Sequence, residues 1–312
     1  MRKSGLKVIK PGARSLLQDG GRVGWQHVGV CPAGPIDTQA ASWANYLVGN
    51  PRSACMVEIA IGSSELQIQV DTWLGLAGPE MQATLNGQPV PGWSRFQVRA
   101  GQTLKFGYAR FGQRAYLAAA GGFQVGTVLG SASTHVQDRL GGIHGDGTAL
   151  QAGDLIPCNN ASNRFRTTAG VSPRYIPDYS AHTPIRLIPG VDSTAFGRSA
   201  FHMLLATVWS VSTQSDRRGI RLSGPVKLPV RAKPWSQGMV TGAVQVPPDG
   251  QPIVLGADRQ TTGGYPVIGF VHPLDLGILS QRQPKSEVCF GQVDLETAIN
   301  DIQADARFWH SM

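Results

Sequence analysis

The chain has 312 residues, enough for one large domain or two ordinary ones. Hydrophobic residues make up 41% of it and charged residues 15%, which is typical of a globular protein and excludes a disordered chain. The net charge is +8, but the lysines and arginines are dispersed and form no zinc-finger, basic-zipper or RNA-binding pattern, so we expect no nucleic acid partner.

Short apolar runs separated by turn residues predict a mainly β fold, because 39 glycines and 21 prolines are scattered among them. In the first half, helical spacing predicts a helix over 36–50, and alternation of apolar and polar residues predicts a half-buried strand over 64–70. Asn86 and Gly87 form the favoured two-residue hairpin turn. Residues 96–108 are interpreted as a hairpin-like pair of strands.

The second half repeats this alternation. Residues 169–184 hold prolines and little periodicity, so we interpret them as a linker. A helix is expected over 195–209, and another over 294–308 with Asp294 as its cap. Strands and turns fill the segments between them.

We therefore predict a first strand-rich domain over 1–168, the linker over 169–184 and a second strand-rich domain over 185–312, with strand exchange between the two left open; that each is a β-barrel domain is what the family resemblance described below implies. Segments 16–30 and 212–224 share an order of Gln, Asp, Arg and Gly. This echo favours duplication of one barrel module slightly, although these residue types are common in turns.

The cysteines and the apolar runs indicate the cellular compartment of the protein. The 4 cysteines lie far apart and form no C-x-x-C pair, so neither a disulfide framework nor a zinc site is indicated. The N-terminus has no apolar core of a secretory signal, and no apolar run reaches the length of about 18 residues that a membrane span needs. We expect a cytoplasmic protein without membrane contact.

Standard catalytic motifs are absent from the sequence. There is no phosphate-binding P-loop, no H-E-x-x-H and no G-x-S-x-G. His135 and His144 flank a glycine-rich turn, and we interpret them as structural because a metal site needs a convergent third ligand. Chemistry must therefore come from Asp, Arg, Gln, Thr, Tyr and Glu side chains.

Two polar clusters have both a functional and a structural interpretation. In the first, over 18–50, Asp19 and Arg22 could pair across a tight turn, while Asp37 is either a site residue or a helix cap and Asn45 either a site residue or a helix surface residue. The second cluster lies over 214–225.

In the second cluster, Asp216, Arg217 and Arg221 alternate with apolar residues. On a strand, Arg217 and Arg221 would share one face, and two guanidinium groups suit a carboxylate or phosphate. A surface ion-pair ladder explains the pattern equally well.

A third cluster follows the short apolar strand at 252–257. Polar residues from Asp258 to Tyr265 leave this strand together with two glycines, which allow a ligand to approach the backbone closely. A loop that only ties two strands does not require so many hydrogen-bonding side chains, so we favour a small-molecule site here.

These segments resemble the allophanate hydrolase subunit 2 family, also called the biotin-dependent carboxyltransferase family. The resemblance runs through nearly the whole chain, and the last of its segments is long and unusual. The matching segments are QDGGRVG (18–24), GPID (34–37), ANYLVGN (44–50), YLAAAGG (116–122), LGSAST (129–134), SDRRGIRLSGP (215–225) and QVPPDGQPIVLGADRQTTGGYP (245–266).

The resemblance implies two linked cyclophilin-like β-barrels and a companion of the subunit 1/B type (KipI-like), which this chain does not include. It also implies a LamB/YcsF-type A subunit where the system is a 5-oxoprolinase. The chain departs from many relatives at Ser236-Gln237-Gly238, where they carry Ser-Glu-Gly, and at PGVDSTAF (189–196). We therefore assign no site role to Gln237 or Asp192.

For function, the resemblance implies first the C-type component of ATP-dependent 5-oxoprolinase, an amide hydrolase that opens 5-oxo-L-proline to L-glutamate. No cofactor would be bound covalently, and a partner would bind the ATP. The alternatives are a carboxyltransferase half of a urea carboxylase-type system, using carboxybiotin presented by another protein, and a non-catalytic KipA-like regulatory subunit.

The candidate site residues come from all three clusters. We expect Asp258, Arg259 and Arg217 to be catalytic. The residues expected to bind substrate are Gln245, Gln260, Thr261, Thr262, Tyr265, Asp216, Arg221, Asp37 and Asn45.

Overall fold

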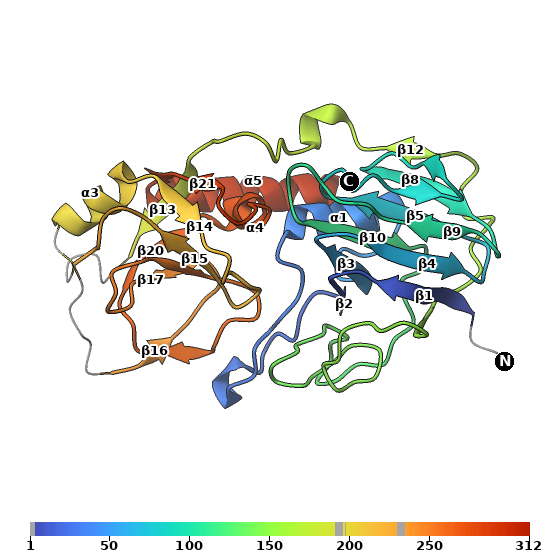
Figure 1. The fold of residues 1–312 in the computed structure, drawn as a ribbon, viewed down its shortest axis with the longest axis horizontal. Coiled ribbons are helices and arrows are strands. Elements are labelled where there is room, and N and C mark those ends of the chain that lie inside the picture. Colours follow the sequence, from blue (N-terminus) through green and yellow to red (C-terminus); the bar gives the residue numbers. More distant parts are fainter. Residues whose placement is uncertain (1–3, 191–195, 197, 230–234) are drawn as a thin grey trace. The chain divides into compact units, whose positions relative to one another are not determined.

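The computed structural model describes residues 4–190, 196, 198–229 and 235–312, so Asp192 lies outside the described residues. Its contacts divide the chain into two units, Met1–Ser180 and Ala181–Met312. Strands dominate both units (Figure 1), which confirms the prediction of a mainly β fold. The predicted linker spans the division between the units, and the predicted domain boundaries stay predictions.

The first unit is built from two six-stranded sheets whose strands pair antiparallel. In spatial order, one sheet contains β11 (Leu155–Pro157), β1 (Gly5–Pro11), β4 (Ser64–Ile68), β9 (Thr103–Lys105), β6 (Thr84–Leu85) and β7 (Gln88–Pro89). The other contains β12 (Ala169–Gly170), β8 (Ser94–Val98), β5 (Thr72–Ala77), β10 (Arg114–Ala119), β3 (Met56–Ala60) and β2 (Arg14–Gln18).

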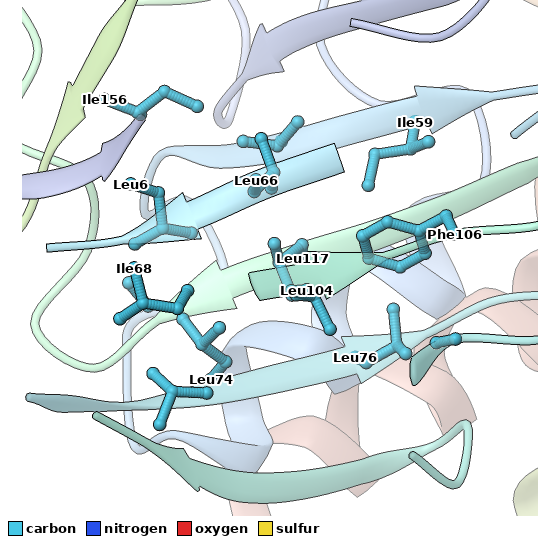
Figure 2. Packing of buried hydrophobic residues seen from close by; sticks show 14 of the residues in the cluster. Leu6, Ile59, Leu66, Ile68, Leu74, Leu76, Leu104, Phe106, Leu117 and Ile156 are labelled. Atoms are coloured by element: carbon cyan, nitrogen blue, oxygen red, sulfur yellow. The ribbon is translucent and has the colours of Figure 1, made fainter. Parts of the chain in front are cut away.

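Apolar side chains from both sheets meet in one core (Figure 2). Leu66 and Ile68 of β4 point into it while Glu65 and Gln67 are only half-buried, as the alternation over 64–70 predicts. Leu117 of β10 comes from the other sheet and is fully buried. Burial of this shared face holds the first unit together.

Helix α1 (Thr38–Leu47) confirms the helix predicted over 36–50. The Asp37 carboxylate accepts a hydrogen bond from the Ala40 N–H at 3.0 Å, and so satisfies an N–H that the helix itself leaves unpaired. The helix ends before Gly49, whose φ of 65° favours glycine. The described part of this unit also contains two short 3-10 helices, η1 (Gln26–Val28) and η2 (Pro173–Tyr175).

One hairpin prediction is confirmed and one is wrong. Asn86 and Gly87 both have positive φ, 48° and 81°, in the turn between β6 and β7. The strands over 96–108 do not pair with each other, because β8 lies in one sheet and β9 in the other. The chain crosses between the sheets at Gly101, whose N–H donates to the Ile68 carbonyl at 2.9 Å.

The second unit has an eight-stranded, nearly closed sheet and a separate two-stranded sheet. Within the large sheet, only β13 and β22 pair parallel among the described strands. Its strands in spatial order are β21 (Glu287–Val288), β14 (Trp209–Val211), β15 (Gly219–Ser223), β18 (Ile253–Leu255), β17 (Ala243–Gln245), β20 (Val267–Val271), β13 (Ile185–Pro189) and β22 (Phe290–Gln292). The small sheet pairs β16 (Gln237–Gly238) with β19 (Thr262–Gly263).

The helices among the described residues of this unit are α3 (Arg198–Ala206), η3 (Pro273–Asp275), α4 (Leu276–Ser280) and α5 (Leu295–Ser311). Helix α5 begins after the cap residue Asp294, as predicted, but only its Ala298 is buried. Its apolar stripe, Leu295, Ile299 and Ile302, is exposed to solvent. Packing of that stripe therefore does not hold α5 in place within the described chain.

An ion-pair network attaches α5 to its unit instead. Arg186 of β13 contacts the Asp275 carboxylate at 2.6 Å and the Asp301 carboxylate of α5 at 2.5 Å. His272, which is fully buried, lies 3.5 Å from the same Asp301 carboxylate. Its Nδ1 accepts a hydrogen bond from the Leu274 N–H at 3.2 Å.

The second unit is expected to lose stability as the pH falls below 6.5. Burial, and then the nearby Arg186, hold the pKa of His272 below its ordinary value of 6.5. Unfolding restores the ordinary pKa, so protonation favours the unfolded chain, and the stabilisation present above pH 6.5 is lost as pH falls through the folded pKa. Unfolding midpoints above and below that pH would measure the effect. In His272→Asn, which keeps an acceptor for Leu274, the pH dependence should be weaker; an unchanged pH dependence would contradict this origin.

Candidate functional site

The centre of the predicted site is a buried ion pair in the second unit. The guanidinium of Arg217 donates from Nε and Nη2 to the two carboxylate oxygens of Asp258, at 2.8 and 2.7 Å. The side chains are only 3% and 9% exposed. Strands β15 and β18 pair with Gly219 opposite Leu255. Arg217 lies two positions before Gly219 and Asp258 three positions after Leu255, so this pairing brings the two side chains together. Such a two-point pair fixes both groups in direction as well as position.

Arg259 directly follows Asp258 in the chain and makes contacts of its own. Its Nε donates to the Met239 carbonyl at 3.2 Å, and its Nη1 donates to the Thr241 hydroxyl at 2.8 Å. The side chain is buried. Arg259 therefore ties the segment around residue 240 to the segment that follows β18, and is a second buried arginine of this unit, directly after Asp258 in the chain.

The polar loop after Arg259 turns back along the two-stranded sheet. Thr262 and Gly263 form β19, opposite Gly238 and Gln237 of β16, which Figure 1 labels. Gln260, Thr262 and Tyr265 are exposed, and Thr261 is half-buried. These four predicted substrate-binding residues therefore lie on the solvent-facing side of the loop.

Gln245 lies on the buried side of the same loop. It ends β17 and is 2% exposed. Its amide nitrogen donates to the Met239 sulfur at 3.3 Å and, at 3.5 Å, to the Tyr265 carbonyl. The structure therefore brings Gln245 to the same loop as Arg259 and Tyr265, although it comes from a different strand.

Two predicted residues of the second cluster lie apart from this arrangement. Asp216 pairs with the neighbouring Arg218 at 2.8 Å and accepts the Gly219 N–H, so it shapes the turn before β15. Arg221 is exposed on β15. The expectation that Arg217 and Arg221 share one strand face is not met, because β15 begins only at Gly219 and Arg217 precedes it.

Asp37 and Asn45 belong to the first unit and have structural partners there. Asp37 caps α1 and also accepts a hydrogen bond from the Tyr179 hydroxyl at 2.8 Å. The alternative that Asn45 is a helix surface residue is wrong, because it is fully buried and donates to the Arg52 and Ala54 carbonyls at 3.2 and 2.9 Å. Its amide closes the turn that follows α1.

The first unit contains a buried polar cluster around Tyr116 that the sequence did not indicate. The Tyr116 hydroxyl donates to Glu58 at 2.8 Å and accepts from the Asp37 N–H at 3.0 Å. Burial, and then the negative charge of Glu58, raise the pKa of Tyr116, so its hydroxyl keeps its proton. A charged residue inside the apolar strand around Glu58 was the one signal for this cluster.

Asp19 and Arg22 hold a distant loop of the first unit. The Asp19 carboxylate accepts hydrogen bonds from Ser131 and Ser133, at 2.5 and 2.7 Å. Arg22 donates to the carbonyls of Val128 and Ser133, at 2.9 and 2.7 Å. The family-like segments 18–24 and 129–134 therefore form one structure, and the sequence alone did not show that they touch.

Metal-ligand clusters and membrane-spanning helices are both absent from the described part of the chain. No three His, Cys, Asp or Glu side chains come together as a metal site there. No helix among the described residues is long and apolar enough to cross a membrane.

Comparison with known proteins identifies the family. Residues 28–292 match the model of the carboxyltransferase domain, subdomains A and B. The chain belongs to this carboxyltransferase domain family. It is 35% identical over 309 residues to the C-type component of the Escherichia coli 5-oxoprolinase, covering 98% of this chain and 97% of that protein.

Solved structures share the fold of this chain. The TTHA0988 protein matches with a TM-score of 0.83 and 35% identity over 93% of this chain. The urea amidolyase of K. lactis matches with a TM-score of 0.82 and 26% identity over 96% of this chain. This chain spans 56% of the first protein and 19% of the second, so the matched region is one part of a longer polypeptide in both.

Proposed function

We propose that the chain is the C-type component of an ATP-dependent 5-oxoprolinase, which converts 5-oxo-L-proline, ATP and water to L-glutamate, ADP and phosphate. The observation that carries this proposal is the match to the corresponding 5-oxoprolinase component of Escherichia coli along almost the full length of both chains. A relative that is matched end to end supports a shared role more strongly than one in which this chain is a small fraction.

The second-unit cluster supplies groups suited to this reaction. Opening a lactam needs an activated carbonyl, and activation by phosphorylation places negative charge next to the reacting carbon. The buried guanidinium groups of Arg217 and Arg259 can stabilise such charge or hold a carboxylate. Asp258 engages both its oxygens with Arg217, so we assign it the role of orienting Arg217 rather than that of a general base.

The proposal includes partners. The chain has no P-loop, so ATP would be bound by another subunit. We propose a subunit 1/B-type companion and a LamB/YcsF-type A subunit, in a cytoplasmic complex. The greater length of the TTHA0988 chain, of which this chain spans 56%, supports a companion part.

A second candidate function is transfer of a carboxyl group from carboxybiotin to an amide such as urea. It is favoured by the carboxyltransferase family model and by the fold shared with urea amidolyase. Carboxybiotin would be presented by another protein, and the loop 260–265 would bind its ureido ring. The same cluster could serve either reaction, because both pass through negatively charged oxygen.

The two candidates are separated by a substrate test with the reconstituted complex. We expect ADP and glutamate to form from ATP and 5-oxo-L-proline. The control pair is carboxybiotin and urea, with carboxylated urea as the measured product. Activity only with the control pair would exclude the 5-oxoprolinase proposal, and activity with neither pair would favour a KipA-like regulatory subunit.

A further inference from the structure

The amide of Gln245 is poorly satisfied for a buried group. Its nitrogen donates to the Met239 sulfur, a weak acceptor, and to a carbonyl at 3.5 Å. Its carbonyl oxygen accepts no hydrogen bond from any residue that the structure describes. Buried polar groups normally have good partners, because leaving one unpaired costs free energy. The Gln245 oxygen is not among the fully buried atoms that lack a partner, so it keeps some contact with solvent and has hydrogen-bonding capacity to spare.

Gly263 shows that a second amide reaches the same point. A Cβ atom built on Gly263 would lie 2.8 Å from Nε2 of Gln245 and 2.8 Å from Nε2 of Gln260. The φ of Gly263 is not in the left-handed region, so its backbone does not require glycine. A side chain at this position would displace both glutamine amides, so the glycine leaves open the space that they share.

Gln260 is the solvent-facing member of this pair. Its side chain is exposed and makes no hydrogen bond with the described residues. A primary amide carries an N–H donor next to a C=O acceptor. A ring that contains an amide presents the same two groups side by side, because the ring holds its N–H and C=O on one edge. The two edges can therefore pair through two hydrogen bonds.

We propose that Gln245 and Gln260 form an amide clamp over Gly263 that binds the cis-amide edge of a cyclic ligand, either a lactam or a cyclic urea. This inference rests on the proposed function for the location of the site, and goes beyond it by naming the groups that select the ligand. The edge is shared by 5-oxoproline, a lactam, and by the ureido ring of biotin.

The test measures binding of small probes to the full chain, alone and in its reconstituted complex, by ligand-observed NMR. The probes are 5-oxo-L-proline, 2-imidazolidinone as a cyclic urea, and N-methyl-5-oxo-L-proline, which lacks the N–H. We expect the N-methyl probe to bind about tenfold more weakly than its parent, which corresponds to about 1.4 kcal/mol. Binding of the lactam but not the cyclic urea would identify 5-oxoproline as the source of the edge, and the reverse would identify biotin.

Variants test the residues themselves. Gln260→Ala and Gly263→Ala are expected to weaken binding of the better probe about tenfold. Gln260 is exposed, so its variant keeps the fold even if the buried Gln245→Leu does not. The matched control is Gly264→Ala, because a Cβ there meets only the Ser236 hydroxyl, at an ordinary 3.7 Å. Binding in this control should stay within about twofold of the native chain.

Three results would overturn the clamp: equal binding of the N-methyl probe and its parent, native affinity in Gln260→Ala, or no probe bound by the native chain in either form. These readouts do not depend on ATP. A complex that makes glutamate while Gln260→Ala binds normally would leave the proposed function standing without the clamp. Selective probe binding in a complex that makes no glutamate would support the clamp and contradict the proposed function.

Discussion

Replacing Arg217 with methionine is expected to lower the free energy of unfolding of the second unit by about 3–5 kcal/mol. The reason is that the Asp258 carboxylate would stay buried after losing both of its charge-assisted hydrogen bonds. Urea unfolding followed by tryptophan fluorescence measures the loss, since Trp209 is fully buried in this unit. The midpoint should fall with little change in the denaturant slope.

Two further variants separate the causes of that loss. Arg218→Met breaks the neighbouring pair with Asp216, whose side chains are 56% and 35% exposed, and should cost less than about 1 kcal/mol. The double variant Arg217→Met with Asp258→Leu removes both buried charges and should recover much of the stability. Equal losses in Arg217→Met and Arg218→Met would show that burial of the pair is not the cause.

In the first unit, the largest expected effect is that of Asp19→Ala. The Asp19 carboxylate accepts four hydrogen bonds, from Gly21, Ser131, Ala132 and Ser133 at 2.5 to 2.9 Å. Hydrogen bonds to a charged group each contribute about 1.5–3 kcal/mol, so a loss of about 3 kcal/mol or more is expected. Hydrogen exchange should rise in the loop 128–148, which Asp19 ties to β2.

Asp146→Ala is the matched control within the same loop. Asp146 is exposed and accepts a local hydrogen bond from the Thr148 N–H, two residues away. We expect this variant to leave the free energy of unfolding nearly unchanged, as is usual for an exposed side chain with only a local partner. If exchange in the loop rises equally in both variants, Asp19 does not hold the loop.

The sequence predicted the elements whose signals are local. Helix α1 could be located because its cap residue Asp37 and the terminating Gly49 lie within a few positions of its apolar pattern. The hairpin expected over 96–108 failed because strand pairing depends on distant partners. β8 pairs with β5 and β9 pairs with β4, and neither pairing can be predicted from residues 96–108 alone.

The same distinction explains the site. Polar side chains after β18 could be singled out from their density, but the contact between Arg217 and Asp258 depends on the pairing of β15 with β18. Arg221 was grouped with Arg217 because the sequence does not show that the strand starts after Arg217. The burial of Asn45 was equally hidden, since its partners lie in the turn beyond α1 rather than on the helix.

The most direct test of the proposed function is an add-back titration. Purified A-type and B-type partners receive increasing amounts of this chain, with ATP and 5-oxo-L-proline in excess, and glutamate release is recorded. The proposed function predicts no release without the chain, and a rise that saturates at a fixed ratio of chain to partners. Glutamate formation at the full rate without the chain, or none at any ratio, would contradict it.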